Sequence, residues 1–82
     1  MKLSTNIPME LRGVQKLVSA KTNKPYFVAN FEDTETGEPT PIYLGGDMNK
    51  LPSDVKKGDT FILNFDYNNK YKELNFISCE RF

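Results

Sequence analysis

A chain of 82 residues with 38% hydrophobic and 27% charged side chains is long enough for one small folded domain, spanning 1–82, and too short for two. It has no histidine and one cysteine, Cys79, which excludes the common zinc sites and an intramolecular disulfide. Its apolar runs are far shorter than the roughly 20 residues of a membrane helix. The N-terminus also lacks the apolar segment of a signal peptide, so we expect a cytoplasmic protein without a membrane partner.

The charges are unevenly distributed although the net charge is zero. Residues 1–31 carry five basic side chains and one acid, a net charge of +4, whereas residues 32–66 carry eight acids and three lysines, a net charge of −5. Salt screens charges that lie more than about 10 Å apart. The basic region can therefore attract phosphate despite the distant acids.

Residues 1–9 are a lead-in that contains at most an edge strand. The first regular pattern after them is a basic hairpin. Alternation indicates a strand over 10–18, in which Gly13 is a candidate bulge. Residues 19–24 form a polar turn, and Asn23 tolerates the left-handed conformation that such a turn requires. The hairpin is therefore a candidate arm that projects from the domain.

The returning strand begins at Pro25 and has two distinct faces. The core face carries Phe27, Ala29 and Phe31, and the opposite face carries Tyr26, Val28 and Asn30. The second face therefore places an aromatic ring beside the turn lysines.

An acidic loop over 32–39 follows, and then a short strand over 40–44 on which we interpret Tyr43 as a structural residue. Asp47 is the candidate cap of one helical turn that ends before Pro52.

The clearest strand covers 60–67, and a tight turn at 68–70 leads into the last strand at 71–79. Five short strands with one helical turn predict an all-β fold: a small five-stranded OB-fold-like barrel with a protruding β-hairpin wing. An SH3-like barrel is the alternative.

Lysines and tyrosines alternate at the two hairpin tips, as expected of a surface for single-stranded nucleic acid. Cations follow the phosphates, and aromatic faces stack the bases without regard to sequence. The candidate residues at the first tip are Lys16, Lys21, Lys24 and Tyr26; at the second, Lys70 and Lys72 lie beside Tyr67 and Tyr71. The competing interpretation is that the lysines only solubilise a loop while Tyr26 packs on a neighbour.

No catalytic constellation is visible. The chain has no glycine motif of the Walker or Rossmann type, and the acids of 32–38 do not have the spacing of an EF-hand loop. We therefore expect a noncatalytic protein without a cofactor, a metal or a small-molecule substrate.

The chain resembles the filamentous-phage gene V family of helix-destabilising proteins in the segments NKPY, TGEPTPIYL and KKGDTFILNF, and in a closing hairpin with an aromatic at its tip. The resemblance implies an OB-like barrel, a symmetric dimer, a DNA-binding wing made from the first hairpin, and cooperative coating of single-stranded DNA in phage or mobile-element replication. It carries over the wing residues Lys16, Lys21, Lys24, Tyr26 and Val28, and the aromatic Tyr71, which reaches across the dimer.

The leading hypothesis is therefore sequence-tolerant binding of single-stranded DNA. RNA binding in translational repression would use the same surface. A protein-interaction module that uses the 32–38 loop or a sheet edge is the alternative from another class. The thin core and the aromatics of 61–76 also predict a homodimer.

Overall fold

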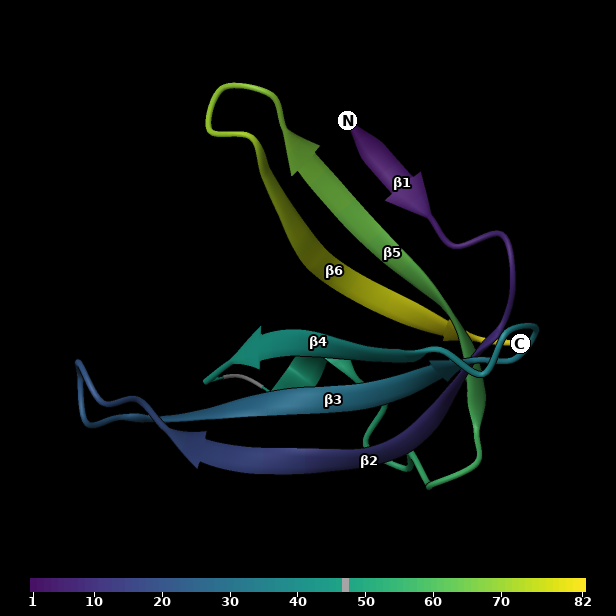
Figure 1. Ribbon diagram of the computed structural model, residues 1–82, viewed down its shortest axis with the longest axis horizontal. Coiled ribbons are helices and arrows are strands. Elements are labelled where there is room, and N and C mark those ends of the chain that lie inside the picture. Colours follow the sequence, from purple (N-terminus) through teal and green to yellow (C-terminus); the bar gives the residue numbers. More distant parts are fainter. Residues whose placement is uncertain (47) are drawn as a thin grey trace.

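The structure is one antiparallel sheet with a single-turn 3₁₀ helix (Figure 1). The computed structural model describes residues 1–46 and 48–82, without the side chain of Met48. Its elements are β1 (Lys2–Ser4), β2 (Met9–Val18), β3 (Pro25–Asp33), β4 (Pro39–Gly45), η1 (Met48–Lys50), β5 (Thr60–Asn68) and β6 (Glu73–Arg81). The expected strands are present, and the lead-in adds β1, which pairs with β5. The candidate cap Asp47 lies outside the described residues. None of the helical structure in the described part of the chain has the length and apolar character needed to cross a membrane.

The all-β prediction is confirmed. A closed five-stranded barrel is not confirmed, because the sheet stays open. The described residues form six strands in the order β1-β5-β2-β3-β4, with β6 paired to the other side of β5. Figure 1 shows two arms, β2–β3–β4 and β1–β5–β6, which diverge from a shared end. Strands β4 and β6 are left as edges that do not pair with each other. Pro39 and Pro41 each remove a backbone donor from β4, which proteins tolerate on edge strands.

The core lies where the two arms meet. Phe31 and Phe61 are almost fully buried and pack edge to face, with ring centroids 6.2 Å apart. Such aromatic pairs add about 0.5–1.5 kcal/mol to the stabilisation from buried area. The buried set is Met9, Leu11, Ala29, Phe31, Ile42, Leu44, Leu51, Phe61, Leu63 and Phe76.

A β-bulge explains why neither face of β2 is uniformly apolar in the sequence. The pairing of β2 with β3 shifts between Leu11 and Gly13, as the candidate bulge at Gly13 predicted. A bulge adds one residue to one strand and so reverses the alternation beyond it. Leu11 is therefore buried before the bulge, and Val14 packs against the core after it.

The two hairpin turns differ in length. Asn23 has φ 60°, which confirms the left-handed conformation expected in the first turn. The second turn is longer than the predicted three residues, because β5 ends at Asn68 and β6 begins at Glu73. The Asn68 Oδ1 accepts backbone N–H groups from Lys70 and Tyr71 at 2.9 and 3.2 Å. This side-chain bonding stabilises the wider turn.

Cys79 is a half-buried strand residue that packs against the core. Its thiol donates to the backbone carbonyl of Lys50 at 3.8 Å. Burial raises the pKa of the thiol, and the positive charge of Arg81 opposes that shift. Less of the reactive thiolate is therefore present at neutral pH than for a free cysteine.

Candidate nucleic-acid interface

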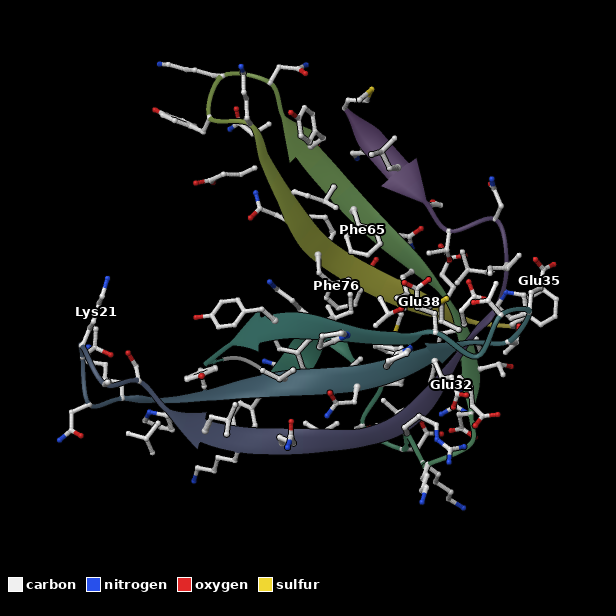
Figure 2. All side chains as sticks on the ribbon, in the orientation of Figure 1. Lys21, Glu32, Glu35, Glu38, Phe65 and Phe76 are labelled. Atoms are coloured by element: carbon white, nitrogen blue, oxygen red, sulfur yellow. The ribbon has the colours of Figure 1, made fainter. Side chains whose placement is uncertain are left out.

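The β2–β3 hairpin extends past the end of β4 and forms a wing (Figure 1). Its turn is closed by two backbone hydrogen bonds: the Ser19 N–H donates to Lys24 at 3.0 Å, and the Asn23 N–H donates to Ser19 at 2.9 Å. Lys21 and Lys24 are exposed, and neither forms an ion pair within the described part of the chain. Figure 2 shows Lys21 at the far end of the wing. Both ammonium groups are therefore available to a phosphate.

Two tyrosines lie side by side at the base of the wing tip. The rings of Tyr26 on β3 and Tyr43 on β4 are 5.5 Å apart between centroids, with an interplanar angle of 46°. Tyr43 is 64% exposed and Tyr26 is half-buried. Tyr43 is therefore not the packed structural residue that we expected from the sequence, and one ring of the pair is open to solvent.

The register of the strands places these rings on the face of the sheet away from the core. Val28 pairs with Tyr43 on one side and with Gln15 on the other, and directly opposed residues share a face. The outer face therefore carries Tyr26, Val28 and Tyr43 in one patch, as predicted for Tyr26 and Val28.

The turn lysines border this patch. Lys21, Tyr26 and Tyr43 line one surface hollow, and Lys24 lines a second hollow with the same two tyrosines. We call Lys21, Lys24, Tyr26, Val28 and Tyr43 the wing patch. It combines cations with an exposed aromatic ring, which are the two groups that single-stranded nucleic acid requires.

Lys16 does not belong to the wing patch. It pairs with Phe27, whose side chain packs against the core, so Lys16 lies on the face opposite Tyr26. Its exposed side chain can still meet a phosphate at the edge of the wing, but not beside the tyrosines.

The second predicted tip is separate from the wing. Lys70 and Tyr71 lie in the β5–β6 turn, at the end of the other arm (Figure 1). Tyr71 is 63% exposed, and the Lys70 ammonium lies 5.4 Å from the centroid of its ring. The two tips therefore lie on diverging arms and do not form one continuous surface.

The acidic residues gather at the opposite end of the β2–β3–β4 arm. Figure 2 shows Glu32, Glu35 and Glu38 at the end farthest from Lys21. Asp33 organises the β3–β4 loop, because its carboxylate accepts the N–H groups of Glu35 and Thr36 at 2.8 and 3.1 Å. The charge separation seen in the sequence therefore becomes a separation in space.

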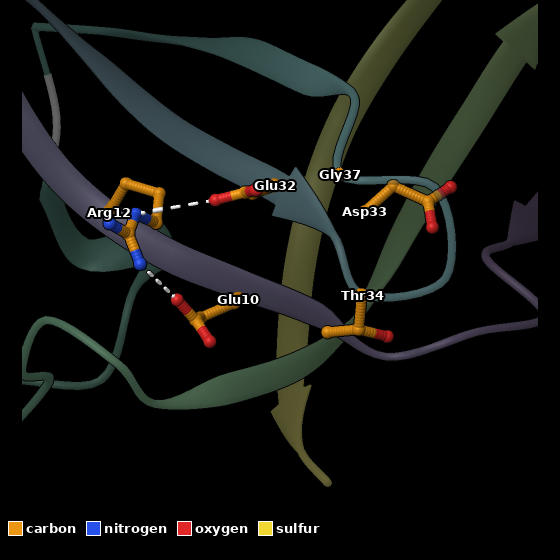
Figure 3. Close-up of a pocket in the computed structure, with 6 residues that line it drawn as sticks. All are labelled: Glu10, Arg12, Glu32, Asp33, Thr34 and Gly37. Carbon is orange, nitrogen blue, oxygen red and sulfur yellow. Dashed lines mark hydrogen bonds and ion pairs between the residues drawn. The ribbon is translucent and has the colours of Figure 1, made fainter.

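Arg12 neutralises part of the acidic end (Figure 3). Glu10 and Glu32 are direct cross-strand partners, an unfavourable position for like charges. The Arg12 guanidinium in the bulge pairs with Glu10 and lies 3.4 Å from a Glu32 carboxylate oxygen. Its hydrogen bond to Glu10, together with the charges of Glu10 and Glu32, raises the pKa of Arg12 above its ordinary value. Because Arg12 already pairs with two carboxylates, it is a poorer phosphate ligand than the wing lysines.

No family model matches the chain, and no curated protein or solved structure matches it either.

Proposed function

We propose that the protein binds single-stranded DNA through the wing patch, without sequence specificity and without catalysis. The observation that carries the proposal is the pair Tyr26 and Tyr43, whose rings lie 5.5 Å apart on an outer face bordered by Lys21 and Lys24. A base stacks on the exposed ring while the lysines contact the flanking phosphates. Each stacked base contributes about 1–3 kcal/mol. Stacking therefore outweighs the electrostatic attraction between DNA and a protein whose net charge is zero.

The resemblance to the gene V family supports the same function. Its KPY element corresponds to Lys24 and Tyr26, which are in the wing patch. We propose that the open sheet is an OB-like barrel in which β4 and β6 do not pair. We also propose that the protein coats replication intermediates of a phage or mobile element. RNA offers the same phosphates and bases, so competition between DNA and RNA oligomers of one sequence measures the preference.

A titration of fluorescent oligo-dT at a series of salt concentrations tests the proposal. Each phosphate contact on a single strand lowers log K by about 0.7 per unit of log salt concentration. The double variant Lys21→Ala/Lys24→Ala should therefore reduce the magnitude of the salt slope by roughly 1.4. The matched control Lys56→Ala/Lys57→Ala removes two exposed lysines outside the wing and should keep the slope. Absence of wild-type binding at the lowest salt concentration would refute the function.

We also propose that the protein is a homodimer in which the second hairpin contacts the partner. A chain this small has a thin core, and the exposed ring of Tyr71 is an apolar surface at a projecting tip. Light scattering should give twice the monomer mass of 9.4 kDa. The variant Tyr71→Ala should shift the protein toward monomer, and a wild-type protein that is monomeric at tens of micromolar would contradict the proposal.

A further inference from the structure

A groove lies between the unpaired edges of β4 and β6, where the two arms diverge. Its volume is about 340 Å³, near the lower end of the roughly 300–1,000 Å³ typical of ligand pockets. Such a volume suits one planar group rather than a long segment. The lining comes from residues 41–45 of β4, from Lys50 of η1, and from residues 74–76 of β6.

The lining combines apolar surface with a cation. Ile42, Leu44 and Phe76 form a nearly buried wall, while Leu74 is 57% exposed although it lies two residues before Phe76 on the same strand. The ammonium of Lys50 makes no ion pair in the described ranges. An apolar surface beside a cation matches a base together with its phosphate.

The groove and the wing patch share one residue. Tyr43 lines the hollows at the wing and also lines this groove, so a strand that stacks on Tyr43 lies at the rim of the groove. Beyond the groove, the β6 arm leads to Lys70 and Tyr71 at the second tip.

A peptide strand is a weaker occupant of this groove. Binding by strand addition depends on backbone hydrogen bonds along a free sheet edge. Pro39 and Pro41 remove two donors from the β4 edge, and β4 ends at Gly45. A ligand that uses stacking and charge does not need those donors.

We propose that the β4–β6 groove is a second nucleotide-binding subsite, in which Leu74 contacts a base and Lys50 its phosphate. The subsite extends the path of a single strand from the wing patch toward the second hairpin, and it rests on the proposed function. It adds affinity only for a strand that is long enough to pass Tyr43.

The test compares a long oligo-dT of about 12 nucleotides with a short one of about 4, both within the usual range of site sizes of about 4–16 nucleotides. The double variant Lys50→Ala/Leu74→Ala should bind the short oligomer like the wild type and bind the long oligomer roughly fivefold more weakly, because it loses the apolar contact of Leu74 and the phosphate contact of Lys50. The matched control Lys57→Ala/Ile77→Ala removes an exposed lysine and a half-exposed β6 side chain outside the groove, and should bind both oligomers normally.

Unchanged binding of the long oligomer, or equal weakening of both oligomers, would overturn the subsite while leaving the proposed function intact. If the wild type binds neither oligomer, the proposed function fails, and the subsite fails with it. If the groove variant turns from dimer to monomer in light scattering and binds the long oligomer normally, the groove holds a second copy of the chain and the subsite is refuted. Circular dichroism checks that each variant is folded.

Discussion

Replacing Tyr26 and Tyr43 together by alanine should weaken the binding of oligo-dT by at least about fivefold at a fixed salt concentration. The base that stacks on the exposed ring contributes about 1–3 kcal/mol, and about 1.4 kcal/mol is a tenfold change in Kd. Tyr43 is 64% exposed and neither ring is part of the buried core, so the double variant should remain folded. Fluorescence anisotropy measures the change, and circular dichroism checks the fold.

Matched variants separate the rings from the hydroxyl groups. Tyr26→Phe/Tyr43→Phe keeps both aromatic faces and should bind within about threefold of the wild type, since stacking uses the ring face. The single alanine variants should not be additive, because the two rings are in contact and each supports the other. A folded double-alanine variant that binds like the wild type would show that the pair does not stack on DNA.

Much of the wing could be predicted from local sequence. The polar turn, the left-handed Asn23 and the alternation of the returning strand depend on residues close together in the chain. Lys24, Tyr26 and Val28 consequently lie where the pattern placed them.

The position of Lys16 shows where local pattern fails. Alternation alone does not show which residues on either side of a candidate bulge face the core. In the structure the shift between Leu11 and Gly13 brings Lys16 opposite Phe27, away from the tyrosines. The same shift brings Arg12 between Glu10 and Glu32, a pairing that the charge count alone could not indicate.

Tyr43 and the open sheet depend on contacts that are distant in sequence. Tyr43 reaches Tyr26 only because β4 pairs with β3 in a particular register, with a shift between Phe27 and Val28. The sequence held one indication that Tyr43 faces outward. Ile42 and Leu44 alternate with Tyr43, and because both are buried, the Tyr43 ring lies on the opposite face. Whether β4 pairs with β6 depends on the curvature of the whole sheet, which a count of strands does not determine.

Phe61→Ala should be the most destabilising change to the fold. Phe61 has no exposed surface and pairs with Met9 of β2 and with Arg81 of β6, so it lies where the two arms join. Its ring packs edge to face on Phe31, and the Arg81 guanidinium lies 5.7 Å from its centroid. Removal of a buried phenyl ring costs about 3–5 kcal/mol, a large part of the roughly 5–15 kcal/mol that stabilises a typical domain.

Urea denaturation followed by circular dichroism measures this loss as a change in the free energy of unfolding. The matched control is Phe82→Ala, because Phe82 is 76% exposed and its removal should change stability by no more than about 0.5 kcal/mol. Phe61→Leu should recover part of the loss, since it refills most of the cavity. If Phe61→Ala costs less than about 1 kcal/mol, the arms are held together mainly by their backbone ladders, and the groove between β4 and β6 would then be set by strand pairing rather than by the aromatic core.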